Sequence, residues 1–254
     1  MPPIKSKVLI NVDLGEAYGN FKGGPDDELF PFIDQANIAC GFHAGDPVVM
    51  ARTVRACKEF NIAAGAHPGL PDIQGFGRRE LVLSQEEHTA NIVYQVGALK
   101  AFLEREGMSL SHVKPHGMLY GLCCRDLDVA RAVMAGIPKD IPVIGLPGTC
   151  METAAAEAGL TFWAEFFADV RYNNDGKLVI ERKRLPWELE DVRKHVTQQV
   201  EESSVTSVDG QTVTFDLKDN LVTICCHSDS PDCVNIVKAT REVVDAFNSK
   251  MGYI

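Results

Sequence analysis

The alternation of two kinds of segment constrains the fold of this chain more than any other feature. Seven short apolar runs, rich in β-branched residues, alternate with longer segments, most of which have helical periodicity. The apolar runs cover residues 8–12, 33–39, 62–66, 113–116, 141–146, 161–166 and 222–226. Strands that alternate with helices form a parallel sheet. The length of 254 residues favours a closed or nearly closed α/β barrel, and a flavodoxin-like open sheet is the alternative.

Local start and stop signals predict the helices. Asp46 followed by Pro47 is an N-cap with proline at the first helical position, so a helix is expected over residues 48–60. Ser84 and Glu87 form a capping box that opens a long helix ending before Gly107. Further helices are expected over residues 26–32, 127–135 and 232–250, and in a segment that ends at Gly159.

The whole chain, residues 1–254, is predicted to form a single barrel domain with an insertion around residues 171–220. No low-complexity linker divides the sequence. The insertion breaks the strand–helix rhythm: Asn174-Asp175-Gly176 and Asp209-Gly210 resemble hairpin turns, with a helix expected over residues 189–203 between them.

Charge and cysteine usage exclude several classes of function. A net charge of -10 argues against nucleic-acid binding, and the basic clusters are only Arg78-Arg79 and Arg182-Lys183-Arg184. The segment before the first apolar run is short and polar, so we do not expect it to be a signal peptide or membrane anchor. The eight cysteines include no Cys-x-x-Cys pair, so they predict buried thiols in a reducing compartment rather than a disulfide or zinc scaffold. We expect a cytoplasmic protein.

Polar residues lie at or just after the ends of the apolar runs. That six runs share this feature is the main indication of function. In a parallel barrel the carboxyl ends of the strands share one face, where catalytic residues collect. The polar residues at these ends are Asp13, Asn37, His67, His116, Glu165 and His227, with Glu16, His43, Lys114, Asp169 and Asp229 close by. Any one of them could be a turn residue or a solvated strand end, but six independent coincidences are harder to explain.

Other polar residues are predicted to be structural. Asp46 and Ser84 are helix caps. His88 and His195 occur in helical segments and are expected at the surface, and His112 precedes its strand and would face the opposite end of the barrel.

Imidazoles, carboxylates and an amine gathered at one face suit two kinds of chemistry. They could bind a divalent metal that activates water or polarises a carbonyl, or act without metal as general acid and base on an amide. Lys114 and Asn37 would then orient a carboxylate or an oxyanion. The sequence contains no Gly-x-Ser-x-Gly nucleophile motif, no phosphate-binding loop and no dinucleotide-binding turn.

Six motifs follow one another along the chain. They are Asn11-Val-Asp13-Leu-Gly15-Glu16, Ala36-Asn37-Ile-Ala-Cys40-Gly41-Phe-His43-Ala-Gly45-Asp46-Pro47, Gly65-Ala-His67-Pro68-Gly69, Gln74-Gly75-Phe-Gly77-Arg78-Arg79, Tyr94-Gln95-Val-Gly97-Ala98-Leu99 and Val113-Lys114-Pro115-His116-Gly117-x-Leu119-Tyr120. In this order they resemble the motifs of the LamB/YcsF family, whose members are also called lactam utilisation proteins or the A subunit of 5-oxoprolinase. The resemblance is dense from Val8 to Tyr120, thinner to Glu165 and patchy beyond Val170.

The resemblance implies a distorted (β/α)7-8 TIM-like barrel related to the glycoside hydrolase and deacetylase barrels. It also implies ATP-coupled hydrolytic opening of 5-oxoproline (pyroglutamate) to glutamate, in a complex with partner subunits B and C. Those partners would bind ATP and activate the lactam, and this chain would open the ring. Two departures from the family pattern affect substrate range and partner binding: Val170 precedes Arg171 after Asp169, and Ser228 replaces a glycine after His227.

The predicted roles follow from these two lines of reasoning. Asp13 is general base or metal ligand, Glu16 is a supporting acid, and His43, His67 and His116 are the catalytic core. The substrate would be held by Asn37, Lys114, Glu165, Asp169 and His227, and a possible divalent metal by Asp13, His43 and His67. The alternatives are a stand-alone metal-dependent deacetylase or amidohydrolase, and a non-catalytic subunit that only binds 5-oxoproline.

Overall fold

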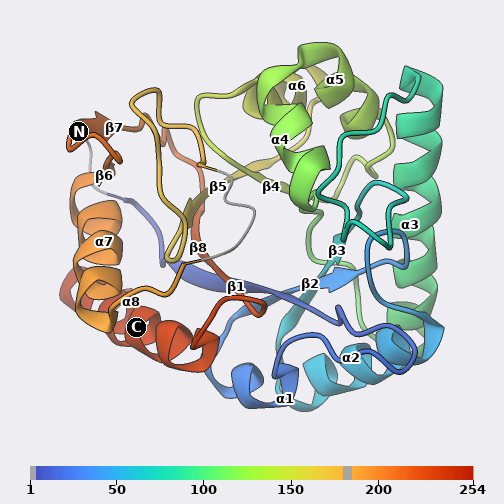
Figure 1. Ribbon diagram of the computed structural model, residues 1–254, viewed down its shortest axis with the longest axis horizontal. Coiled ribbons are helices and arrows are strands. Elements are labelled where there is room, and N and C mark those ends of the chain that lie inside the picture. The colour runs from blue at the N-terminus through green and yellow to red at the C-terminus, as the bar shows by residue number, and fades with distance from the viewer. Residues whose placement is uncertain (1–3, 180–184, 254) are drawn as a thin grey trace.

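The structure is a computed structural model that describes residues 4–179 and 185–253 (Figure 1). The Arg182-Lys183-Arg184 cluster lies outside the described residues. Six parallel strands form a curled sheet at the centre, in the order β3-β2-β1-β8-β5-β4. Their bounds are β1 Leu9–Leu14, β2 Gln35–Ala39, β3 Ala63–His67, β4 Val143–Gly145, β5 Phe162–Phe167 and β8 Val222–His227.

A single residue, Val113, joins the two edge strands of this sheet. It forms parallel bridges with Ala66 of β3 and with Val143 of β4. The backbone hydrogen bonds from Ala66 N to His112 O and from Lys114 N to Ala66 O, each 2.9 Å, hold it on the β3 side. The sheet is therefore closed into a barrel, as predicted, and the open flavodoxin-like sheet is wrong.

The helices lie around the outside of the strands (Figure 1). Their bounds are α1 Asp26–Leu29, α2 Pro47–Glu59, α3 Gln85–Arg105, α4 Gly117–Arg125, α5 Leu127–Ala135, α6 Cys150–Ala158, α7 Leu189–Glu202 and α8 Cys233–Met251, with a 3-10 turn at Phe30–Phe32. No helix among the described residues is both long and apolar enough to cross a bilayer.

The predicted start and stop signals act as expected. The Asp46 carboxylate accepts hydrogen bonds from the backbone N–H groups of Val48 and Val49 and so caps α2. The Ser84–Glu87 capping box is present at the start of α3. Gly159 ends α6 in the left-handed conformation, with φ of 67°, which only glycine adopts without strain.

Two predictions about local structure are wrong, and one helix was missed. The run 113–116 is not a strand, because only Val113 pairs with its neighbours and Pro115 has no N–H to donate. The helix α4 was not predicted. His88 and His195 are buried rather than exposed, because each lies on the inward face of its helix, one turn from Ile92 and Gln199 respectively.

The described part of the segment between β5 and β8, residues 168–179 and 185–221, adds no strand to the main sheet. It begins with a bridge between Tyr172 and Leu178 around the predicted turn at residues 174–176. After α7 it forms an antiparallel pair, β6 Ser204–Thr206 with β7 Thr212–Thr214, around the predicted Asp209-Gly210 turn.

The inward face of α3 generates a stability prediction. Leu99 is fully buried in the hydrophobic core, whereas Val93 on the same helix is 55% exposed. We expect Leu99→Ala to lower the free energy of unfolding by about 2–5 kcal/mol, because it removes buried methyl groups and leaves a cavity. Val93→Ala should change it by no more than about 0.5 kcal/mol. Urea unfolding of both variants measures the difference, and equal effects would contradict the assigned helix face.

Candidate active site

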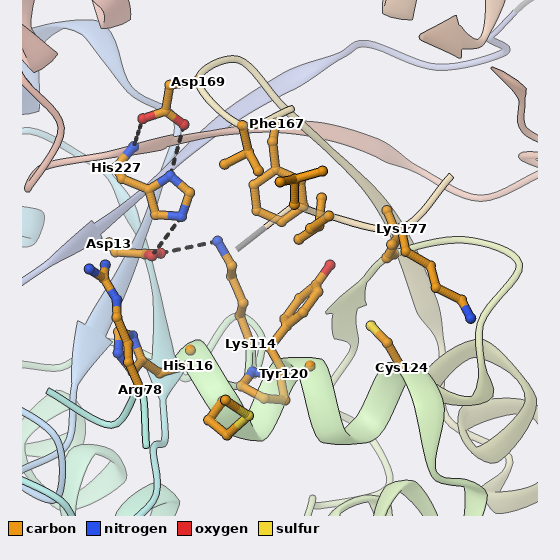
Figure 2. Close-up of a pocket in the computed structure, with 18 of the residues that line it drawn as sticks. Asp13, Arg78, Lys114, His116, Tyr120, Cys124, Phe167, Asp169, Lys177 and His227 are labelled. Atoms are coloured by element: carbon orange, nitrogen blue, oxygen red, sulfur yellow. Dashed lines mark hydrogen bonds and ion pairs between the residues drawn. The ribbon is translucent and has the colours of Figure 1, made fainter. Parts of the chain in front are cut away.

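A cavity of about 250 Å³ opens at the carboxyl ends of the strands. Its floor is polar and includes Asp13 from β1, His67 from β3 and His227 from β8. Its walls are apolar residues such as Phe167 together with several cationic side chains (Figure 2). The cations that line it are Arg78, Lys114, Arg125, Arg171 and Lys177. Among the described residues that line the cavity, only Asp13 and Asp169 are acidic, so this part of the lining favours an anionic ligand although the whole chain is acidic.

Asp13 lies at the centre of this floor and is held from two sides. Its Oδ1 accepts hydrogen bonds from Asn37 Nδ2 at 2.8 Å and from Lys114 Nζ at 3.1 Å. Its Oδ2 faces His67 Nε2 at 3.3 Å and His227 Nε2 at 3.8 Å. Burial raises the pKa of Asp13, but the charges of His67 and Lys114 outweigh burial and hold that pKa well below its ordinary value. The carboxylate is therefore ionised at neutral pH.

Lys114 is 2% exposed and is surrounded by acceptors. Its Nζ lies 2.8 Å from Glu165 Oε1, 3.1 Å from Asp13 Oδ1, 3.1 Å from Asn11 Oδ1 and 2.9 Å from Cys225 Sγ. Burial lowers the pKa of Lys114, but its interactions with Asp13, Cys225 and Glu165 outweigh burial and raise the pKa well above its usual range. The ammonium group is thus fixed and charged at the base of the cavity.

His67 and His116 each donate a proton from one ring nitrogen and turn the other ring nitrogen toward each other. His67 Nδ1 lies 2.7 Å from the carbonyl oxygen of Lys114, and His116 Nε2 lies 2.8 Å from that of Phe76. A carbonyl accepts only, so each of these nitrogens carries a proton and donates it. The opposite nitrogens, His67 Nε2 and His116 Nδ1, are 3.0 Å apart. Two neutral rings would place two lone pairs against each other, so this point must take up a proton or a cation.

His43 and Glu16 continue the cluster behind His116. The rings of His43 and His116 stack with centroids 3.6 Å apart, and His43 Nε2 lies 3.1 Å from Glu16 Oε1. Burial, aided by the negative charge of Asp13, raises the pKa of Glu16 well above its ordinary value. Burial and the neighbouring His67 lower the pKa of His43. The contact between His43 and Glu16 is therefore a hydrogen bond between two neutral groups rather than an ion pair.

Two groups of side chains could each hold a metal ion. Within each group, one potential ligand atom from every residue lies within 4.8 Å of the others. The first group is Glu16, His43, His67 and His116. The other group is Asp13, Cys225 and His227. Nitrogen and carboxylate oxygen donors in the first group suit zinc or a similar divalent ion, and the facing lone pairs of His67 and His116 fit the same requirement. The structure divides the predicted ligands: His43 and His67 fall in the first group, and Asp13 falls in the second.

His227 is oriented by Asp169. Its Nδ1 lies 2.8 Å from Asp169 Oδ1, and its backbone N–H donates to Asp169 Oδ2 at 3.2 Å. Ser230 Oγ donates to the same carboxylate. Figure 2 shows the resulting line from Asp169 through His227 and Asp13 to Lys114. Both Asp169 and His227 line the cavity, so their predicted contact with a substrate stays a prediction with compatible geometry.

Asn37 and Glu165 lie one layer below the cavity. Both are fully buried, and neither is among the residues that line the cavity. Asn37 contacts Asp13, and Glu165 contacts Lys114. In these positions Asn37 can support Asp13 and Glu165 can support Lys114. The predicted direct contact of Asn37 and Glu165 with substrate stays a prediction.

Sequence reasoning missed two buried polar residues of the barrel interior. His112 is fully buried and its Nε2 lies 2.8 Å from Asn37 Oδ1. Tyr120 lines the cavity, and burial together with the nearby charge of Glu165 raises the pKa of its hydroxyl well above the ordinary value. The signal for His112 was available: residues 112, 114 and 116 alternate, so their side chains share one face of an extended segment.

The fold and the cavity define an α/β-barrel protein whose active-site candidates are buried carboxylates and histidines. The chain belongs to the LamB/YcsF family, because the model of that family matches residues 8–253.

Three known proteins illustrate the similarity. Lactam utilization protein lamB of Emericella nidulans is 65% identical to this chain over 253 residues, and the match covers 100% of both proteins. The A subunit of 5-oxoprolinase from Pyrococcus horikoshii is 43% identical over 244 residues, which are 94% of each chain. The crystal structure of the lactam utilization protein from Thermus thermophilus superposes with a TM-score of 0.86, at 40% identity and 97% coverage of both chains.

The protonated state of Glu16 generates a pH-dependent prediction. In metal-free protein with a chelator present, the folded chain keeps this carboxyl protonated above about pH 4.3, where the unfolded chain releases the proton. Wild-type stability should therefore fall relative to Glu16→Gln by about 1.4 kcal/mol per pH unit above that point, until the pKa of the folded state is reached.

Urea unfolding at several pH values measures this difference. Glu104→Gln is the control, because Glu104 is exposed on α3 and its replacement should give a pH profile parallel to that of wild type. A Glu16→Gln profile that is also parallel would mean that Glu16 is ionised in the folded protein.

Proposed function

We propose that this chain is the ring-opening subunit of an ATP-coupled 5-oxoprolinase, which hydrolyses 5-oxoproline or a close lactam to the open-chain amino acid. The observation that carries the proposal is the convergence of Asp13, His67, His116 and Lys114 at one end of a cavity rich in cations. The substrate class comes from the names of the relatives, which are a 5-oxoprolinase component and a lactam utilization protein. Hydrolysis of an amide needs a base, an acid and stabilisation of an oxyanion.

The residues of the cavity supply these roles. Asp13 Oδ2 is ionised and accepts the proton of the attacking water, whose oxygen bonds to the lactam carbonyl carbon. The His67–His116 pair delivers a proton to the ring nitrogen as the C–N bond breaks. Arg78 and Lys114 attract the substrate carboxylate and the developing oxyanion. His227, which is held by its hydrogen bond to Asp169, contacts the reacting group on the side away from the His67–His116 pair.

ATP enters the proposal through partner subunits. An unstrained lactam is resonance-stabilised, and its hydrolysis near neutral pH needs coupling to phosphoryl transfer. The sequence carries no nucleotide-binding motif, and the relatives are named as one lettered component of 5-oxoprolinase, which implies further components. We therefore place ATP on partner subunits B and C. The cytoplasmic location stays a prediction.

A divalent metal is compatible with this site. Glu16, His43, His67 and His116 would hold it. A bound ion would polarise the lactam carbonyl or lower the pKa of a bound water. Asp13 lies 3.3 Å from His67, next to this group, and its role in accepting a proton is the same with or without the ion.

Activity measurements with cognate partner subunits test the proposal. We expect Asp13→Ala, His67→Ala and His116→Ala each to lower the turnover of 5-oxoproline by about 10²–10⁴-fold, because each removes a group that accepts or delivers a proton. His88→Ala is the control, since His88 is buried on α3 outside the cavity. Near wild-type turnover of the three site variants would refute the assignment.

The histidine cluster favours a second candidate, a stand-alone metal-dependent amidohydrolase that needs neither partner nor ATP. If this is correct, purified protein should contain stoichiometric zinc or another transition metal. A chelator should then abolish hydrolysis of simple amides or acetylated sugars, and His67→Ala should lose the metal. Protein that is active with partners after complete removal of metal would exclude this candidate.

A further inference from the structure

His112 occupies a position in the barrel interior for which the proposed chemistry provides no role. Its ring is fully buried and does not line the cavity. Burial and the charge of Lys114 lower the pKa of His112 to about 3, so the ring is neutral in the physiological range. A neutral, buried imidazole with two partners acts through those partners rather than by changing its charge.

The hydrogen-bond partners of His112 and Asn37 determine which atom donates in each of these hydrogen bonds. Ser111 Oγ lies 3.1 Å from His112 Nδ1, and a hydroxyl can donate to that nitrogen. His112 Nε2 then carries the ring proton and donates it to Asn37 Oδ1 at 2.8 Å. With its oxygen occupied, Asn37 uses Nδ2 as a double donor, to Asn11 Oδ1 at 2.7 Å and to Asp13 Oδ1 at 2.8 Å.

We propose that His112 is a positioning residue that fixes the orientation of the Asp13 carboxylate through the side-chain amide of Asn37. If the amide of Asn37 turned over, its oxygen would face the carboxylate of Asp13, which is repulsive. The hydrogen bond from His112 stabilises the other orientation. Oδ1 of Asp13 is then anchored by Asn37 and Lys114, and Oδ2 is left facing His67.

The backbone makes room for this contact at Gly65. Gly65 of β3 pairs in register with Asn37 of β2, and a Cβ atom added at residue 65 would overlap the His112 ring. Any side chain at residue 65 would push the imidazole away from Asn37. A glycine in the middle of a strand weakens that strand, and here its cost is offset by the close approach of His112.

Substitution of His112 tests the catalytic consequence, which rests on the proposed function. His112→Leu should lower kcat for 5-oxoproline, with partner subunits present, by about 10- to 100-fold, and KM should change little because His112 lies outside the cavity. His112→Gln should restore much of the loss, since its amide N–H can donate to Asn37. His88→Leu replaces a buried histidine outside the cavity and should leave kcat unchanged.

A double-mutant cycle separates positioning from general loss of structure. If His112 acts through Asn37, His112→Leu combined with Asn37→Ala should lower kcat no more than Asn37→Ala alone. Gly65→Ala should resemble His112→Leu, whereas Gly97→Ala, which meets no atom within 4 Å, should behave as wild type. Additive effects, or wild-type kcat in folded His112→Leu, would overturn the proposal.

Two measurements do not depend on 5-oxoproline turnover. Crystal structures of wild type and His112→Leu should show the Asp13 carboxylate rotated or displaced in the variant, and an unmoved Asp13 would overturn positioning even if turnover has failed for other reasons. Nitrogen-15 NMR of the wild-type imidazole should find Nε2 of His112 protonated and Nδ1 unprotonated wherever the protein is folded. The opposite tautomer would overturn the proposal even if no variant folds.

Discussion

The buried ammonium group of Lys114 is the constraint on which the rest of the barrel interior depends. A lysine that is 2% exposed is stable only when acceptors replace its water, and here Glu165, Asp13 and Asn11 do so. Removing one partner of a buried charge typically costs about 3–5 kcal/mol, because the other charge stays buried and unpaired. The positions of Asp13 and Glu165 are therefore fixed by Lys114 as much as by their own strands.

The closure of the sheet brings these three residues together from distant parts of the chain. Asp13 is on β1, Glu165 is on β5, and Lys114 follows the single bridging residue Val113. Because Val113 pairs with both edge strands, the side chain of Lys114 extends into the barrel and reaches both carboxylates. A full strand at this place is not needed. One bridged residue, followed by the turn into α4, holds His116 beside His67.

Much of this arrangement could be predicted from strand–helix alternation, because parallel strands place their carboxyl ends on one face. Asp13, His67, His116 and Lys114 were found in this way. The depth of each side chain was harder to predict: Asn37 and Glu165 lie inside their strands, below the cavity. His112 was assigned to the opposite end because it precedes its strand, although alternation with Lys114 and His116 already indicated the inward face. Tyr120 was missed together with α4, whose helical pattern is short.

Charge and hydrogen bonding point to the same feature of the site. The ion-paired group of Lys114, Asp13 and Glu165 has one carboxylate more than ammonium, and Asp13 Oδ2 faces His67. The facing nitrogens of His67 and His116 need a proton or a cation between them. One positive charge at that point satisfies both requirements. As a proton it would be available to a leaving nitrogen, and as a metal ion it would polarise a carbonyl, so either occupant prepares the same floor of the cavity for cleavage of an amide.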